Sequence, residues 1–211
     1  MRNVLFTVIA SFGLLCGFSA QAQDRIPIDR SDATVQALLE HSRTTTSLKA
    51  DFVQEKHLKM LATPVVSTGI IRFKKPGQLR WQVDTPEPSV AVVDGKTVMI
   101  SKAGKEDDVT AADRQAFSAI TNLIEGIVSG ELLDGKSMVA TFFTTKEGLL
   151  VELLPTDPRM AKRLKQVTLL FDTTTHILRE LRMEQPSGEF TLTRFSNAKF
   201  GVAHGATTFK L

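Results

Sequence analysis

The sequence predicts an α+β protein that is mainly β, with one large antiparallel sheet and two helices. Three observations lead to this prediction: many short strand-like segments, tight turns between them, and one long amphipathic helix in their midst. The clearest hairpin turns at Pro76-Gly77, where proline presets φ and glycine accepts a positive φ, as in a type II turn. After it, Leu79, Trp81 and Val83 alternate with polar residues, so this strand has one apolar and one polar face.

The first helix is expected to begin after Ser31 or Asp32, either of which can cap it. The second is expected from Asp113, as N-cap, to Gly130, which ends it. Six apolar residues share one face of this second helix: Phe117, Ile120, Leu123, Ile124, Ile127 and Val128. Such a helix either completes the core or lies as a lid over the open side of a curled sheet.

Strands are expected throughout the rest of the chain. Asp94-Gly95 predicts a two-residue hairpin, 102–108 reads as a charged hairpin tip, and 155–165 reads as a turn with a short helical piece. Short links between successive strands favour antiparallel pairing. The predicted strands are 48–59, 65–74, 78–84, 89–93, 97–101, 137–145, 149–154, 166–172, 177–185, 189–196 and a last piece near 207–210.

The N-terminal 22 residues are typical of a secretory signal peptide. Arg2 is followed by an apolar run over 4–18 and by Ala20-Gln21-Ala22, which predicts cleavage before Gln23 and export to the periplasm. A retained membrane anchor is one alternative, but the run is shorter than a spanning helix. The mature chain, 23–211, is expected to form a single domain, since no repeat or linker divides it.

Lipidation at Cys16 is a second alternative for this segment, but two leucines precede the cysteine where a lipoprotein signal has a small residue. Cleavage after residue 22 removes Cys16, the single cysteine of the chain. The mature protein is therefore expected to have no disulfide, no cysteine metal site and no cysteine nucleophile.

Composition excludes several classes of function. The net charge is only +3 and charges of both signs are interspersed, so no nucleic-acid footprint is expected. The four histidines are scattered without metal-ligand spacing, and no catalytic motif is present, so neither a metal site, a cofactor nor an active site is expected. Thirteen phenylalanines without any tyrosine suit a dry apolar cavity, although chance usage is the alternative.

A set of motifs resembles the LolA family of periplasmic outer-membrane lipoprotein carriers over nearly the whole mature chain. The order and spacing of these motifs, more than any one of them, carry the resemblance. They are Leu48-x-x-x-Phe52-x-Gln54-x-Lys56, Ser67-x-Gly69, Phe73-x-Lys75-Pro76-x-x-x-x-Trp81, Pro86, Asp94-Gly95-Lys96, Leu153-x-Pro155, Val167-x-Leu169-x-Phe171-Asp172 and the segment 184–195.

The resemblance implies an unclosed antiparallel β-barrel of about eleven strands, with a helical lid over a hydrophobic cavity. It implies a monomeric chaperone that receives lipoproteins from an inner-membrane ABC exporter, holds their acyl chains and delivers them to an outer-membrane receptor. Neither a cofactor nor covalent chemistry is implied. A carrier of glycolipid or polyene, a sensor or binding module on the same scaffold, and, as the weakest alternative, an enzyme remain open.

The resemblance also assigns candidate site residues. Those expected to line the cavity are Phe52, Ile71, Phe73, Leu79, Trp81, Val83, Phe171, Leu181 and Met183. Those expected in the lid or its gating are Lys75, Phe117, Ile120, Leu123, Ile124 and Ile127. Taken alone, each apolar member is more typical of an ordinary core residue than of a ligand contact.

Two positions depart from the family pattern. Lys75 stands where well-studied carriers have an arginine that holds the empty lid closed, and Leu79 stands at an aromatic position. Lysine keeps the charge but lacks the planar fork of arginine, so it can replace only part of such a clamp. A plain surface lysine in a turn is the alternative role for Lys75.

Overall fold

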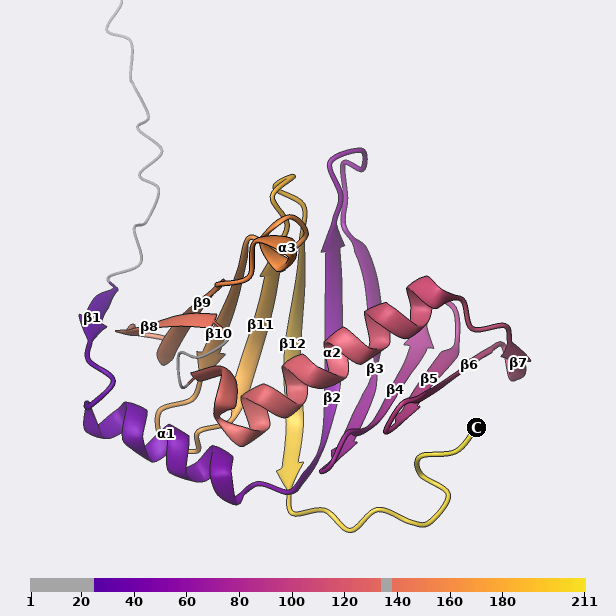
Figure 1. The fold of residues 1–211 in the computed structure, drawn as a ribbon, viewed down its shortest axis with the longest axis horizontal. Helices are drawn as coiled ribbons and strands as arrows, with labels where there is room; N and C mark the ends of the chain where they lie inside the picture. The colour runs from indigo at the N-terminus through magenta and orange to yellow at the C-terminus, as the bar shows by residue number, and fades with distance from the viewer. Residues whose placement is uncertain (1–24, 134–137) are drawn as a thin grey trace, which may run out of the picture.

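The computed structural model describes residues 25–133 and 138–211, and the predicted signal peptide, 1–22, lies outside them. Twelve strands form one sheet in which all neighbours are antiparallel, in the order β1-β8-β9-β10-β11-β12-β2-β3-β4-β5-β6-β7. The edge strands β1 and β7 do not pair with each other, so the sheet is unclosed (Figure 1). The strands are β1 Ile26–Ile28, β2 Ser47–His57, β3 Val65–Lys74, β4 Gln78–Thr85, β5 Ser89–Asp94, β6 Thr97–Lys102, β7 Lys105–Asp107, β8 Met138–Thr144, β9 Leu149–Pro155, β10 Gln166–Phe171, β11 Leu178–Glu184 and β12 Phe190–Phe200.

This architecture confirms the predicted fold class, with one strand more than the expected eleven. The hairpin at Pro76-Gly77 joins β3 to β4, with Ile71 opposite Trp81 and Gly77 at a φ of +62°. The two short edge strands, β1 and β7, had no sequence prediction of their own, because three residues are too few for a visible alternation.

The helices are α1 (Ala33–Thr44), α2 (Ala111–Ser129), α3 (Pro158–Ala161) and the 3-10 helix η1 (Glu131–Leu133). Asp32 caps α1, since its carboxylate accepts a hydrogen bond from the backbone of Thr34 at 2.8 Å. The N-cap of α2 is Thr110. The prediction of Asp113 as N-cap is therefore wrong. Asp113 is instead the third helical residue of a capping box, in which its side chain accepts from the backbone N–H of Thr110. Gly130 ends α2 in the left-handed conformation, as expected.

The position of α2 follows from the strand order. It connects β7 to the β8 end of the sheet, and these two segments lie at or next to opposite edges. A connection between them must cross one face of the sheet, and Figure 1 shows α2 running in front of the strands from one side to the other. The long helix thus lies over the concave face.

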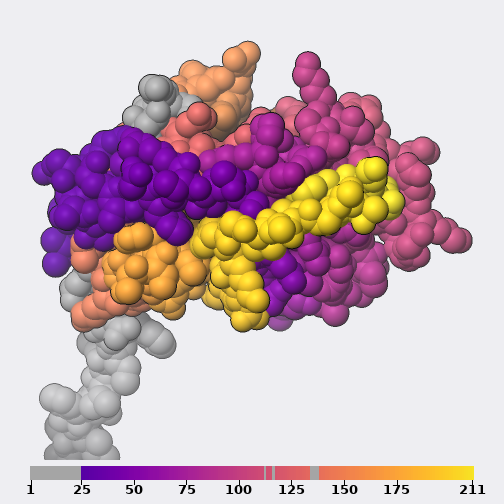
Figure 2. Space-filling view, turned by 90° about the horizontal axis from the view of Figure 1, so that it is seen from below, coloured from indigo at the N-terminus to yellow at the C-terminus, as the bar shows by residue number. Residues whose placement is uncertain are grey.

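The last eleven residues, 201–211, contain no strand, which corrects the strand expected near 207–210. They cross the lower side of the molecule as an extended segment (Figure 2). Arg80 holds this segment by donating to the backbone oxygens of Thr208 and Lys210, at 3.4 and 2.8 Å. His204 pairs with the backbone oxygen of Phe73, at 3.1 Å. Both sheet edges lie elsewhere, so the segment has no edge strand to extend.

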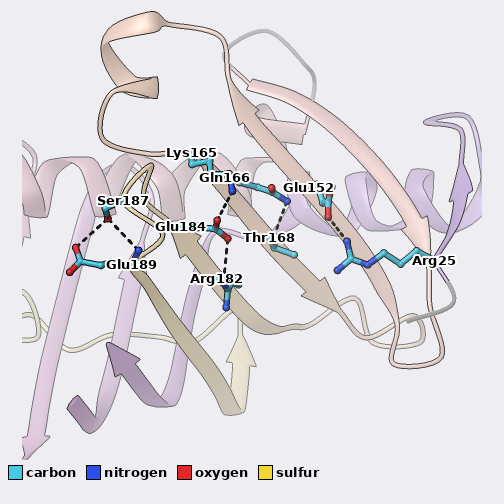
Figure 3. A network of polar contacts seen from close by, with 9 residues as sticks. All are labelled: Arg25, Glu152, Lys165, Gln166, Thr168, Arg182, Glu184, Ser187 and Glu189. Atoms are coloured by element: carbon cyan, nitrogen blue, oxygen red, sulfur yellow. Dashed lines mark hydrogen bonds and ion pairs between the residues drawn. The ribbon is translucent and has the colours of Figure 1, made fainter. Parts of the chain in front are cut away.

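The face of the sheet away from α2 carries a network of polar side chains, beside exposed apolar ones such as Val53 and Leu154. Along β9 to β12, residues that alternate with the buried ones form ion pairs and hydrogen bonds (Figure 3). Glu184, for example, accepts from Lys165 at 2.7 Å and from Arg182 at 3.3 Å. The sheet is therefore one-sided, as the alternation around Trp81 predicts.

The apolar face forms two separate clusters. The first cluster packs α1 against β8 to β11 and contains Val35, Leu38, Leu39, Ile127, Leu133, Met138, Phe142, Leu149, Val151, Leu153, Val167, Leu169, Phe171 and Leu181. The second cluster lies on β2 to β6 and contains Ala50, Phe52, Ile71, Phe73, Leu79, Trp81, Ala91, Val93, Val98, Ile100, Ile124 and Val128. Because α2 supplies residues to both clusters, it bridges the two halves of the sheet.

Candidate functional site

An apolar cavity of about 70 Å³ lies at the seam between the two clusters. Its wall takes Phe171 and Leu181 from the first cluster and Ala50 and Ile71 from the second. Phe195 packs against both clusters and also lines it. The full lining is His41, Ser42, Thr45, Leu48, Ala50, Ile71, Ile124, Ile127, Val128, Phe171, His176, Ile177, Leu178, Leu181, Phe195, Ala198 and Phe200.

The strand order explains why a space remains there. Strands β8 to β11 pack on α1 and strands β2 to β6 pack on α2, whereas β12 lies between the two groups. On β12, Ala198 is a small residue that faces the cavity and lies within a break in register between Ser196 and Lys199. A small side chain at this point leaves the seam unfilled.

The predicted cavity residues divide into three groups. Ile71, Phe171 and Leu181 line the cavity. Four others are buried inside the second cluster: Phe52, Phe73, Leu79 and Trp81. Val83 and Met183 are partly buried at the margins of the second and first clusters, respectively. The alternation of the strands put all nine on the inner face, but only three of them border empty space in this state.

The predicted lid residues also divide. Ile124 and Ile127 line the cavity from above. Phe117 and Ile120 pack against the second cluster, and Leu123 packs against the first. The apolar face of α2 therefore seals the seam and both adjoining cores at once.

Lys75 contacts α2. Its Nζ donates to the backbone oxygen of Val128 in the last turn of α2, at 3.4 Å. The unpaired carbonyls of a helix C-terminus carry partial negative charge, so a cation is favoured there. The bond is long and Lys75 is only half-buried, which makes this a weak tie.

Two histidines of the lining were not among the residues predicted from the sequence. His41 lies in the last turn of α1, and His176 lies in the turn between β10 and β11. Their ring centroids are 5.8 Å apart. The helical spacing of Leu38 and His41 is a signal that could have placed the first of them, since residues three apart share a face.

Stability is expected to depend on pH through His41. Burial in the cavity wall, with a smaller contribution from His176, lowers the pKa of His41 below its ordinary value. The unfolded chain, with a histidine pKa of about 6.5, then binds more protons than the folded chain below that pH. We therefore expect the free energy of unfolding to fall from pH 7.5 to 5.5 by more in the wild type than in His41→Phe. Urea unfolding at both pH values measures this, and parallel losses in the two proteins would contradict it.

Nowhere in 25–133 or 138–211 do three or more metal-ligating side chains gather. Within the same ranges, none of the helices has the length and apolar character needed to cross a membrane. The cavity wall can bury apolar groups and supplies imidazole nitrogens as hydrogen-bonding groups.

The family and the relatives to which this chain is similar are lipoprotein carriers. The profile of the family described as "Outer membrane lipoprotein carrier protein LolA" matches residues 43–211. An outer-membrane lipoprotein carrier protein of Dechloromonas aromatica (strain RCB) is 29% identical over 189 residues, which cover 88% of this chain and 86% of that protein. One from Coxiella burnetii (strain CbuK_Q154) is 25% identical over 185 residues, covering 86% and 83%.

Among solved structures, a LolA superfamily protein from Nitrosomonas europaea superposes with a TM-score of 0.45 at 11% identity. The match covers 85% of this chain and 99% of that one.

Proposed function

Because the chain belongs to the LolA family of outer-membrane lipoprotein carriers, we propose that it is a periplasmic lipoprotein chaperone. It binds the acyl chains of a lipoprotein beneath α2, receives them from an inner-membrane ABC exporter and passes them to an outer-membrane receptor. It works as a monomer, without a cofactor and without covalent chemistry. The observation that best supports this proposal is the apolar cavity at the seam between the two clusters.

The energetics of acyl chains explain why such a cavity is needed. Each methylene favours an apolar site over water by about 0.8 kcal/mol, so a sixteen-carbon chain gains on the order of 12 kcal/mol. Spontaneous release into water is therefore negligible. Transfer has to run from one apolar site to the next, and the opening of the lid has to cost much less than the chain gains.

The cavity is too small for cargo in this state. One water-sized group needs about 10–15 Å³ of such space, so a cavity of about 70 Å³ holds only a few methylene-sized groups. Lipoprotein acyl chains contain dozens of them. We therefore infer that the cargo displaces α2, which contributes Ile124, Ile127 and Val128 to the roof.

We propose that Lys75 helps to hold α2 over the cavity through its hydrogen bond to Val128. Replacing Lys75 with methionine removes the hydrogen bond to Val128 and keeps the apolar stem. We expect the closed state to lose about 0.5–1 kcal/mol, so that the lid opens two- to fivefold more often. Hydrogen exchange of the amides of α2 measures the opening. Unchanged exchange in Lys75→Met, relative to the surface control Lys199→Met, would show that Lys75 is only a turn residue.

The cargo itself provides the test of the function. The protein is purified from native periplasm and its bound material is analysed by mass spectrometry. Triacylated lipoprotein is the expected result. Recovery of free glycolipid or polyene alone would contradict the proposal and favour a carrier of another lipid-like cargo on the same fold.

A further inference from the structure

The cavity has one polar end. His41 from α1, His176 from the β10–β11 turn and Phe200 from the end of β12 meet there. The His41 ring stands edge-on to Phe200, with centroids 5.1 Å apart and an interplanar angle of 89°. The rest of the wall is apolar apart from Ser42 and Thr45, and the hydroxyl of Thr45 already donates to the backbone oxygen of His41 at 2.9 Å.

One atom at this end has no partner. Nε2 of His41 is buried and makes no hydrogen bond within the described chain. An unpaired polar atom in such a position costs about as much as a lost hydrogen bond, and such atoms are rare in folded proteins. Packing against Phe200 alone does not explain a histidine, because phenylalanine or leucine would pack there without this cost.

The second histidine is held in an unusual conformation. His176 has a φ of +56°, which residues other than glycine seldom adopt, and its backbone N–H donates to the oxygen of Asp172 at 2.9 Å. This turn places the ring in the cavity wall beside His41. Two independent local features thus bring imidazoles to the same end of an apolar site. A few polar groups in an otherwise apolar wall are typical of ligand pockets.

We propose that the His41–His176 end binds the carbonyl-bearing head of an acyl chain, and that the tail runs across the sheet toward Ile71. This inference rests on the proposed function, since it concerns the same cavity. An imidazole N–H of His41 donates to the carbonyl oxygen, which gives the buried nitrogen the partner that it lacks. An ester of a lipid and the carboxylate of a free fatty acid share this chemistry.

The strand order fixes the direction of the bound chain. From His176 the cavity wall passes over β11 and β12 to Ala50 on β2 and Ile71 on β3. The two histidines are the ionisable side chains in the described lining. In its uncharged form, His41 can donate a hydrogen bond to a neutral ester as well as to an acid. Burial, which lowers the pKa of His41, favours that form. The protein part of a cargo would then leave the cavity beside α1 and the β10–β11 turn.

Trp81 provides a readout of this direction. It is the only tryptophan of the chain and lies on β4 opposite Ile71, which puts it one strand beyond the β3 wall of the cavity as counted from His176. Bromine quenches tryptophan at short range, so 16-bromohexadecanoate and 2-bromohexadecanoate report the positions of tail and head. The 16-bromo probe is expected to quench Trp81 at least twofold more strongly at saturation. Equal quenching, or stronger quenching by the 2-bromo probe, overturns the proposed orientation.

Variants test the role of His41 in the same assay. His41→Phe is expected to weaken binding of 16-bromohexadecanoate or its methyl ester about three- to tenfold, as for one lost hydrogen bond. Binding of 1-bromohexadecane, which has no carbonyl, should not change. His57→Phe is the matched control, because His57 stacks on Phe190 and does not line the cavity.

The outcomes separate this inference from the function on which it rests. A preference for the ester over the acid supports a lipid-linked chain, and the reverse supports a free fatty acid; either result supports the head site. If His41→Phe weakens the binding of 16-bromohexadecanoate, its methyl ester and 1-bromohexadecane equally, or weakens none of them, the head site is wrong. The proposed acyl cavity is not affected by that result. If no probe quenches Trp81 in the wild type, the acyl cavity itself is wrong.

Discussion

Replacing Gly69 with alanine is expected to lower the melting temperature by roughly 6–12 °C. Gly69 lies on β3 at a shift in register, between Phe52 on β2 and Val83 on β4. A Cβ added there would lie 1.9 Å from the backbone oxygen of Gln82 and 2.9 Å from Cζ of Phe52. The strands would have to separate, because a backbone oxygen cannot rotate away as a side chain can.

The size of this effect follows from the cost of overpacking. Forced backbone shifts cost about 3 kcal/mol at the upper end of the usual range, and each kcal/mol corresponds to about 2–4 °C in a chain of this length. Thermal unfolding followed by circular dichroism measures the difference. Gly205→Ala is the matched control, since its Cβ would meet only Thr208 Oγ1 at 3.8 Å, and we expect it to stay within about 0.5 kcal/mol of wild type. A Gly69→Ala protein as stable as this control would show that β3 and β4 do not approach so closely.

Gly69 also illustrates what the sequence can predict. The motif Ser67-x-Gly69 supported the family resemblance, and the alternation at Leu79 and Trp81 correctly gave the face and span of β4. The reason for the glycine was not predictable, because it depends on the register shift that brings the oxygen of Gln82 against it. Local pattern determines strands and their faces, whereas close approach between strands depends on their pairing.

The cavity also could not be predicted from local sequence pattern alone. Alternation put Phe52 and Ile71 on one apolar face, but it could not say that the first is packed and the second borders a void. That distinction depends on where the two clusters separate, and hence on the position of β12 between them. The strand predicted at 207–210 was wrong for a related reason: its composition favours a strand, but Arg80 binds its backbone oxygens and the segment pairs with no strand of the sheet.

The contacts of α2 combine extensive apolar burial with weak polar ties. Ile124 and Ile127 are nearly fully buried, whereas the tie from Lys75 is a single long hydrogen bond. Burial of apolar surface is not directional, so under the proposed function acyl chains would replace α2 as the partner of the same surface. A carrier needs this exchange, because both the empty and the loaded forms must keep their apolar face out of water.

Replacing Ala198 with phenylalanine is therefore expected to weaken acyl binding strongly while the fold persists. Ala198 faces the cavity at the seam, and a phenyl ring there would fill most of a space of about 70 Å³. We expect the affinity for 16-bromohexadecanoate, measured by quenching of Trp81, to fall at least tenfold, which corresponds to about 1.4 kcal/mol or more. Native periplasm should then yield the variant without lipoprotein.

Two measurements separate blocked binding from damage to the fold. The melting temperature of Ala198→Phe is expected to stay within a few degrees of wild type, because the ring occupies space that is already empty and not packed core. Ala206→Phe is the matched control: Ala206 is exposed on the C-terminal segment and outside the cavity lining, so its affinity should equal that of wild type. If Ala198→Phe binds the probe as tightly as Ala206→Phe, the acyl chains occupy another part of the concave face, and the seam is only a packing defect.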